Sequence, residues 1–388
     1  MHNILLVIFI LSAYAIVHSY IVYPLWLLAF TTGKKKETPQ YSLHEDLPEV
    51  GILMAAYNEE KVIGEKIASV FETTYPVEKI TFYIGSDAST DKTDAIIEEY
   101  AKKYPQIKLV RFGGRTGKSG IINQLAFEAK QEIFILTDAN VIFKPDTIFS
   151  LIRHFKKENV AQVAANIIKV SFTNKGIASQ EKSYIALENK IKNAESVRWN
   201  IIMGAEGGCY AIRKQNFSPV PKNFYMDDFY ITLNVIEQGK EIVFDKEAIC
   251  NEDVPTQSQE EFKRKVRISI GNFQNLNRYK KLLWKFNGIS FSFWSHKVLR
   301  WLTPFLLMIC FFTSFPLMFH SKSFMILFIL QLFGFFTPVL DWLLRINISL
   351  LRFVSHFYLM NLALLKGFMI YMKGVESNVW QPTKRETN

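Results

Sequence analysis

Long apolar runs near both ends of the sequence enclose a region in which apolar and polar residues alternate. Residues 4–30 contain no Lys, Arg, Asp or Glu, and a helix of about 20 apolar residues crosses a bilayer. We therefore predict a transmembrane anchor over residues 1–33. A cleaved signal peptide is the alternative, but no Lys or Arg precedes the run, and the run continues well past the small-residue pattern at 13–15.

Three further apolar runs follow in the C-terminal third of the chain. Residues 302–319 and 324–344 are predicted to span the membrane. The run at 348–372 contains polar and basic residues, so it predicts either a poor spanning helix or one that lies in the membrane interface. We assign 281–388 to interfacial and transmembrane helices with a cytosolic tail. Lysines at 34–36 follow the first span, which predicts a cytosolic middle region anchored in the cytoplasmic membrane.

Stretches with strand and helix patterns alternate between the membrane segments. The predicted strands lie at 50–56, 80–86, 107–112 and 132–137, and the predicted helices at 59–73, 91–104 and about 118–130. Strands that alternate with helices form a mostly parallel, doubly wound sheet. We therefore expect one α/β domain over residues 40–280, with its ligand site beyond the carboxyl ends of the strands.

Polar groups follow each of these four strands. Tyr57 and Glu59 come after the first, Asp87 after the second, the loop 113–120 after the third, and Asp138 after the fourth. Each acid alone is also explained by a turn or a helix cap, where Asp is common. Their shared position at one edge of the sheet favours a ligand site.

The loop 113–120, GGRTGKSG, looks at first like the phosphate-binding loop of a nucleoside triphosphatase. That motif is G-x-x-x-x-G-K-[ST], whereas Gly113 is one residue too close to Gly117. We therefore reject the triphosphatase interpretation. Lys118, Arg115 and the loop amides can still contact a phosphate.

The net charge of +10 raises the question of nucleic-acid binding. The basic residues gather beside the apolar runs and in the segment 262–267, FKRKVR. Anionic lipid or a substrate diphosphate explains this distribution better than nucleic acid does. Cys209, Cys250 and Cys310 are far apart and odd in number, which predicts reduced structural thiols.

Several segments, in order along the chain, resemble the motifs of family 2 inverting glycosyltransferases. They are AAYNEE (55–60), SDASTDKT (86–93), GGRTGKSGIINQ (113–124), TDANVIFKPD (137–146), GGCYAIRK (207–214), MDDFYITLNVIEQGKEIVFD (226–245) and EEFKRKVRISIGNFQNL (260–276). The resemblance implies the Rossmann-like type A glycosyltransferase fold and a nucleotide-diphospho-sugar donor, UDP being favoured. The flanking spans and the tail VWQPTKR (379–385) are similar to the membrane-bound branch, which includes hyaluronan, cellulose and poly-N-acetylglucosamine synthases.

The resemblance also implies roles for particular residues. Donor binding falls to Tyr57, Glu59 and Asp87 around the nucleoside, to Lys118 near the nucleotide, and to Arg264 and Arg267 on the diphosphate. Asp138, with Asn140, corresponds to the D-x-D motif that works with a divalent metal, Mg²⁺ or Mn²⁺. Asp228 corresponds to the general base, and we favour it over the adjacent Asp227.

Two departures bear on the expected function. Asn140 stands where the D-x-D motif often has a second carboxylate, and the motif of Arg264 and Arg267 lacks the tryptophan of the polymer synthases. We expect sugar transfer to a growing polysaccharide. The alternatives are transfer of one sugar to a lipid-linked acceptor, and a non-catalytic membrane scaffold that binds export partners. The sugar itself cannot be inferred from motif spacing.

Overall fold

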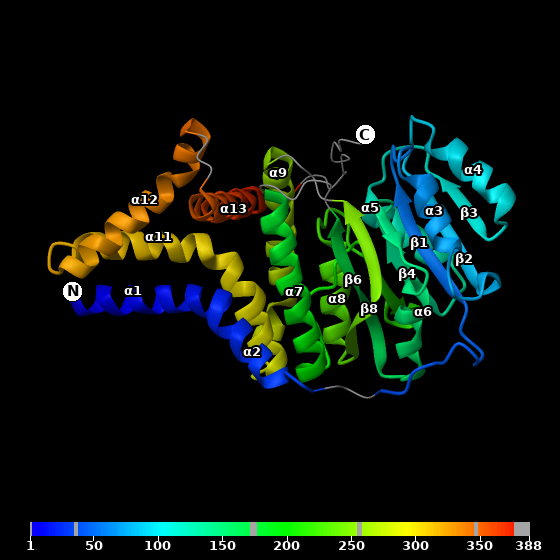
Figure 1. Cartoon of the computed structure of the whole chain (residues 1–388), viewed down its shortest axis with the longest axis horizontal. Coiled ribbons are helices and arrows are strands. Elements are labelled where there is room, and N and C mark those ends of the chain that lie inside the picture. Colours follow the sequence, from blue (N-terminus) through cyan, green and yellow to red (C-terminus); the bar gives the residue numbers. More distant parts are fainter. Residues whose placement is uncertain (1, 35–37, 171–176, 254–257, 345–347, 376–388) are drawn as a thin grey trace. The chain divides into compact units, whose positions relative to one another are not determined.

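The computed structural model describes residues 2–34, 38–170, 177–253, 258–344 and 348–375. The tail motif at 379–385 and two of the three lysines at 34–36 lie outside the described residues. The chain divides into two compact units, one made of the described parts of Met1–Phe30 and Gln257–Val375, the other of those of Thr31–Thr256. Each unit is described in turn (Figure 1).

The second unit is built on one eight-stranded sheet with the order β3-β2-β1-β4-β7-β6-β8-β5. Its strands are β1 (Val50–Ala56), β2 (Ile80–Ser86), β3 (Ile107–Arg111), β4 (Ile133–Thr137), β5 (Val141–Phe143), β6 (Val160–Val170), β7 (Cys209–Arg213) and β8 (Glu241–Asp253). β1 pairs in parallel with β2 and β4, and β2 pairs in parallel with β3. β7 runs antiparallel between β4 and β6, β6 and β8 are parallel, and β5 is antiparallel to β8. The mostly parallel α/β sheet expected from the sequence is confirmed.

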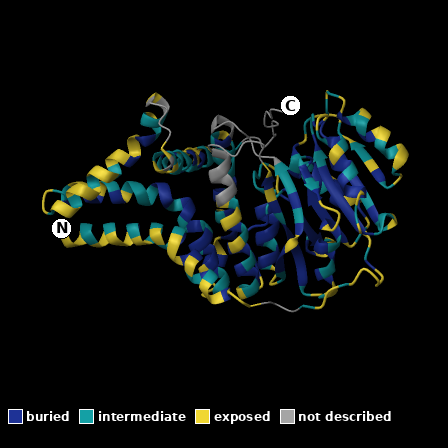
Figure 2. Cartoon of the chain, in the orientation of Figure 1, coloured by how far each residue is buried: buried dark blue, intermediate teal, exposed yellow. Residues whose placement is uncertain are grey.

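Helices cover both faces of this sheet (Figure 1). They are α3 (Ile63–Phe71), α4 (Thr93–Lys103), α5 (Lys118–Glu128), α6 (Thr147–Ile152), α7 (Ile177–Trp199) and α8 (Asp227–Glu237), with short turns η2 (Val77–Lys79), η3 (Arg153–Lys156) and η4 (Lys214–Asn216). Apolar residues of α3, α4 and α6 form one buried cluster with alternate residues of β1, such as Ile52 and Met54. Most residues of the central strands are buried (Figure 2). On the other face, a Cβ at Gly85 of β2 would lie 2.2 Å from Ile121 of α5, so glycine permits this close approach.

The carboxyl ends of β1 to β4 form the edge at which the sequence predicts a ligand site. Asp87, the first residue after β2, donates its backbone N–H to the Ala56 carbonyl at the end of β1, with a distance of 2.9 Å. Asn58 and Ala88, which follow these two strands, have left-handed backbones with φ of 53° and 58°. The chain therefore turns sharply as it leaves each strand, and the turns bring the loops together.

The first unit contains the long apolar helices, several of them with outward-facing apolar residues (Figure 2). Its elements are α1 (His2–Val17), η1 (His18–Val22), α2 (Tyr23–Thr31), α9 (Ser258–Tyr279), η5 (Lys280–Trp284), α10 (Gly288–Ser292), η6 (Phe293–Val298), α11 (Leu299–Leu317), α12 (Lys322–Leu344) and α13 (Ser349–Lys373). Among the described residues, four helices are long and apolar enough to cross a membrane, at 2–31, 288–317, 322–341 and 350–373.

The helix that contains most of the predicted span 302–319 begins well before residue 302. The continuous helix begins at Gly288, where the Asn287 side chain accepts hydrogen bonds from the N–H groups of Ile289 and Ser290 at 3.1 Å. Residues 288–301 include several polar and basic side chains, so this segment does not stand out as an apolar run, although it is helical. The run at 348–372 is one continuous helix, and whether it spans the membrane or lies in the interface stays a prediction.

Candidate active site

Asp87 organises the loop between β3 and α5. Its side chain is 4% exposed. Oδ1 accepts a hydrogen bond from the backbone N–H of Thr116 at 2.5 Å. Oδ2 accepts one from the backbone N–H of Gly117 at 3.2 Å and another from Nε of Arg115 at 3.1 Å. Gly117 has a φ of +83°, a left-handed conformation that suits glycine. The loop that resembles a phosphate-binding loop is therefore held by a buried carboxylate.

Arg115 joins two residues that the sequence assigned to donor binding. Its guanidinium pairs with Asp87 and lies 3.4 Å from the ring centroid of Tyr57. Glu59 is 8% exposed, and its backbone N–H donates to Thr93 Oγ1 at 2.8 Å. The sequence analysis considered Arg115 only as a phosphate contact. The glycines around Arg115 did not indicate that its guanidinium would stack on the Tyr57 ring. Tyr57, Asp87 and Arg115 thus form one platform at the strand ends.

Lys118, the first residue of α5, lies among carboxylates from two other segments. Its Nζ is 2.7 Å from Asp138 Oδ1 and 3.8 Å from Asp227 Oδ2. Burial alone would lower the pKa of Lys118, but these two carboxylates outweigh it and hold the pKa above its ordinary value. The ammonium group is therefore charged at neutral pH. The structure brings Lys118, Asp138 and the start of α8 together.

Asp228 is the buried carboxylate of this cluster. It lies in the first turn of α8, it is 8% exposed, and its Oδ1 accepts the N–H of Phe229 at 2.7 Å. Burial and the neighbouring Asp227 carboxylate raise the pKa of Asp228 to about 7, against the opposing charge of Lys118. A carboxylate with a pKa near the working pH is suited to accept a proton. The environment of Asp228 agrees with the general-base role that the resemblance implies.

Asp138 and Asn140 are the residues that the sequence assigns to a metal. The Asp138 side chain is 36% exposed beside Lys118, while the Asn140 amide donates to Glu252 Oε1 on β8 at 3.4 Å. Among the described residues, no group of three His, Cys, Asp or Glu side chains could hold a metal alone. Oxygen donors suit Mg²⁺ or Mn²⁺, and Mg²⁺ is commonly held by one or two carboxylates together with substrate phosphates. The site fits a metal of that kind, which Asp138 would hold together with the phosphates of a bound donor.

One part of the chain matches a known protein family. Residues 51–218 match the family model described as Glycosyl transferase family 2. These residues form a family 2 glycosyltransferase domain. Asp228, Arg264 and Arg267 lie beyond the matched range.

Curated proteins similar to this chain include a lipid glucosyltransferase and a polysaccharide synthase. The chain is 35% identical over 126 residues to a beta-monoglucosyldiacylglycerol synthase of Nostoc sp., an alignment that covers 32% of this chain and 27% of the relative. It is 25% identical over 244 residues to the poly-beta-1,6-N-acetyl-D-glucosamine synthase of Staphylococcus epidermidis, covering 61% of this chain and 58% of the relative. Each alignment therefore covers less than two thirds of the relative.

A solved structure shares the fold over nearly the whole chain. It is a mannosyltransferase from Pyrobaculum calidifontis in complex with GDP-Man and Mn²⁺. The TM-score is 0.72 at 18% identity, and the match covers 95% of this chain and 99% of the mannosyltransferase. The expected type A glycosyltransferase fold is confirmed.

Gly207, which sequence reasoning did not single out, lies against the Asp228 carboxylate. A Cβ at this position would be 2.9 Å from Asp228 Oδ2 and 3.3 Å from Cγ. Thr232 fixes the two segments together, because its Oγ1 donates to the Asp228 carbonyl at 2.9 Å and accepts the Ala205 N–H at 3.2 Å. The adjacent glycines at 207 and 208 were the feature of the sequence that could have indicated a close contact here.

Substitution Gly207→Ala is expected to displace the Asp228 carboxylate. Overpacking of this kind costs about 1–3 kcal/mol, so we expect kcat for sugar transfer to fall about 5- to 100-fold, with the fold intact by circular dichroism. The control is Gly64→Ala, because a Cβ at Gly64 meets Tyr100 at an ordinary 3.5 Å. Equal rates for the two variants would show that Gly207 does not set the position of Asp228.

Lys66 of α3 holds the turn that carries Asp138 and Asn140. The side chain is fully buried, and its Nζ donates to Thr137 Oγ1 at 2.9 Å and to the Val141 carbonyl, which are the residues on either side of the turn. The ammonium also lies 3.4 Å from the centroid of the Phe143 ring. Burial lowers the pKa of Lys66 to about 8, although Cys209, Cys250 and Asp138 act in the opposite direction.

This buried lysine makes stability depend on pH in a defined direction. In the unfolded chain Lys66 keeps its proton up to a pKa of about 10.4, so between pH 8 and 10 the unfolded state binds more protons and folding becomes more favourable. We expect the wild type to gain about 2 kcal/mol over this range relative to Lys66→Met. Chemical unfolding of both proteins at pH 8 and 10 measures the difference, and parallel curves would exclude the lowered pKa.

Arg264 and Arg267 lie on α9 of the other unit. Nε of Arg264 donates to Glu261 Oε2 at 2.7 Å, and Nη2 donates to Oε1 at 3.1 Å. Burial would raise the pKa of Glu261, but Arg264 and Lys265 lower it overall. The sequence analysis missed this pairing. The contact of either arginine with the diphosphate stays a prediction.

Proposed function

We propose that this chain is a membrane-bound inverting glycosyltransferase that moves a sugar from a nucleotide-diphospho-sugar to an acceptor hydroxyl. The observation that carries the proposal is the buried Asp228 carboxylate, with its pKa raised to about 7, beside Lys118 and Asp138 at the strand ends of a family 2 domain. Such a group accepts a proton from an alcohol as the alcohol attacks.

The proposed reaction is a single displacement. The acceptor oxygen forms a bond to the anomeric carbon, the bond from that carbon to the diphosphate breaks, and the acceptor proton passes to Asp228. Oδ1 of Asp228 is occupied by the Phe229 N–H, so Oδ2 is the atom that takes the proton. The absence of a side chain at Gly207 leaves room next to Oδ2. No covalent sugar intermediate is needed, and the anomeric configuration inverts.

We assign the donor to the platform and loop at the strand ends. Tyr57, Glu59 and Asp87 would surround the nucleoside, since Asp87 fixes the loop and Arg115 fixes the Tyr57 ring. Lys118, Arg264 and Arg267 would meet the negative charge that develops on the leaving diphosphate. A divalent metal held by Asp138 and the donor phosphates, with Asn140 nearby, would supply further positive charge there.

Two kinds of acceptor are proposed. A growing polysaccharide is the first candidate, supported by the longer alignment with the poly-beta-1,6-N-acetyl-D-glucosamine synthase. Transfer of one sugar to a lipid is the second, supported by the higher identity to beta-monoglucosyldiacylglycerol synthases. With either acceptor, the family 2 domain would lie on the cytosolic side of the cytoplasmic membrane. Partner subunits for export would be needed only for the polysaccharide.

The test uses the protein in nanodiscs with Mg²⁺ or Mn²⁺ and a panel of radiolabelled UDP- and GDP-sugars, with diacylglycerol supplied as one acceptor. A long product from one donor supports a polysaccharide synthase and identifies the sugar. A glycolipid with one sugar supports the lipid acceptor. No transfer from any donor, with or without added lipid, would contradict the proposal and favour the scaffold.

A further inference from the structure

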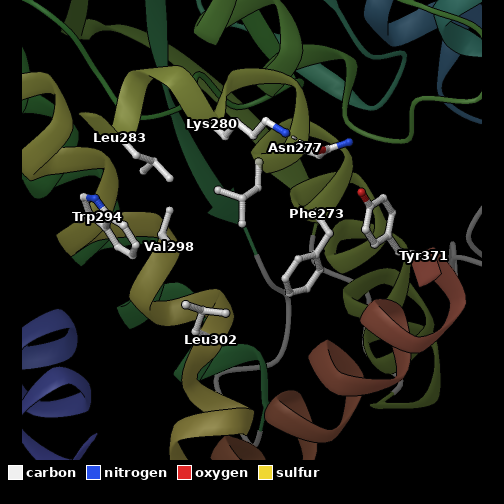
Figure 3. Close-up of a pocket in the computed structure, with 9 residues that line it drawn as sticks. Phe273, Asn277, Lys280, Leu283, Trp294, Val298, Leu302 and Tyr371 are labelled. Carbon is white, nitrogen blue, oxygen red and sulfur yellow. Dashed lines mark hydrogen bonds between the residues drawn. The ribbon is translucent and has the colours of Figure 1, made fainter. Parts of the chain in front are cut away.

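A pocket of about 320 Å³ lies within the first unit, which contains the long apolar helices (Figure 3), and none of its lining residues is proposed for sugar transfer. Two helical faces form it. One comes from α9 and η5 and the other from η6 and α11, and α13 adds one side chain. The lining residues are Phe273, Leu276, Asn277, Lys280, Leu283, Trp294, Val298, Leu302 and Tyr371.

The spacing of these residues explains how two helices make one pocket. Phe273 and Lys280 are seven residues apart, and Trp294 and Leu302 are eight apart, so each pair lies on one face of its helix. Trp294 and Val298 belong to the π-helical stretch η6. Wide turns of this kind occur frequently at functional sites.

The lining residues suit a ligand that has a hydrocarbon chain with one charged end. Most lining side chains are apolar, and Lys280 is the one charged residue among the nine. Lys280 is exposed, and its Nζ lies 3.5 Å from Asn277 Oδ1, as Figure 3 shows. The volume is at the low end of small-molecule pockets. It suits a segment of one chain rather than a whole lipid.

The charge of the surrounding residues indicates that the bound molecule is negatively charged. Residues 262–375 contain fifteen Lys and Arg but one acid, Asp341. Trp284 and Phe286, shortly after Lys280, are 65% and 87% exposed. Exposed aromatic residues beside lysines are typical of the headgroup region of a membrane, where anionic lipids attract basic segments.

We propose that this pocket binds an anionic membrane phospholipid, with part of one acyl chain between the two helical faces and the phosphate at Lys280. The site goes beyond sugar transfer and does not depend on it. The phospholipid would fix α9 and η5 to the other helices of this unit, because the chain contacts residues of both faces.

The test measures contact between Trp294 and a brominated acyl chain, because bromine quenches tryptophan fluorescence on contact. The protein is reconstituted in phosphatidylcholine nanodiscs with increasing fractions of dibrominated phosphatidylglycerol, or of dibrominated phosphatidylcholine. The chain has seven tryptophans, so the contribution of Trp294 is the difference between the wild type and Trp294→Phe. Circular dichroism and size-exclusion chromatography verify that each variant is folded.

We expect half-maximal quenching of Trp294 at an approximately fivefold lower fraction of phosphatidylglycerol than of phosphatidylcholine. Lys280→Gln should remove this preference, whereas Lys281→Gln, the adjacent lysine outside the pocket, should retain it. Leu302→Phe, which fills the pocket, should weaken quenching by both lipids. Equal quenching by the two lipids in the wild type, or equal behaviour of the two lysine variants, would overturn the proposal.

Discussion

Substitution Asp228→Asn is expected to reduce kcat about 10²- to 10⁴-fold, which is the usual contribution of a general base. The amide keeps the shape of the side chain but cannot accept the proton of the acceptor hydroxyl. Binding of the nucleotide-sugar should change little, because the donor is assigned to other residues. Initial rates of transfer and equilibrium titration with the donor measure the two effects separately. The matched control is Asp227→Asn, which we expect to cost less than Asp228→Asn.

The same residue sets the expected pH dependence. Asp228 acts only when deprotonated, and its pKa is raised to about 7 by burial and by Asp227. Below that pH, kcat/KM should fall about tenfold per unit, and above it kcat/KM should level off. Persistence of this acid limb in Asp228→Asn at its residual rate would assign the limb to another group. Unchanged transfer in Asp228→Asn would remove the proposed mechanism altogether.

Substitution Asp87→Asn is expected to lower kcat/KM for the donor about 10- to 100-fold, mainly through a higher KM. The Asp87 carboxylate accepts three hydrogen bonds, from Arg115, Thr116 and Gly117. Hydrogen bonds to a charged group contribute about 1.5–3 kcal/mol, and an amide can accept at one oxygen only. The loop 113–117 and the Arg115 platform under Tyr57 should therefore loosen.

The control for Asp87→Asn is Asp94→Asn, which removes an ion pair to the half-exposed Arg111. Surface pairs contribute about 0–1 kcal/mol, so donor KM should stay near that of the wild type. Steady-state kinetics against donor concentration, with binding of the free nucleotide as a second readout, separates the variants. A KM for Asp87→Asn equal to that of Asp94→Asn would mean that the loop does not bind the donor.

Much of the sheet was predictable because its first half is local in sequence. β1 to β4 alternate with helices, and their patterns gave the strands within a residue or so. The second half depends on pairing over long separations. β7 enters antiparallel between β4 and β6, and β8 pairs on both sides with strands far from it in sequence. No local pattern specifies such insertions.

The candidate site also combines residues that local patterns predicted with residues that depend on long-range contacts. The strand patterns placed Asp87 and Asp138 at the ends of the second and fourth strands, but they did not show that Lys118 would lie between Asp138 and Asp227. The sequence analysis did not single out Lys66. Its position between Ile63 and Val70 puts it on the buried face of α3, a signal that helical spacing did contain. Gly207 and Arg115 act through contacts across the fold, which spacing alone does not reveal.

Proton NMR of the transfer reaction tests the central claim of inverting transfer most directly. The protein would be supplied with an α-linked nucleotide-sugar and the acceptor found active in nanodiscs, and the anomeric proton of the new bond would be followed from the first turnover. We predict a β-linked product, formed without a covalent sugar intermediate and lost in Asp228→Asn. An α-linked product would contradict the single displacement and the role of Asp228 as its base.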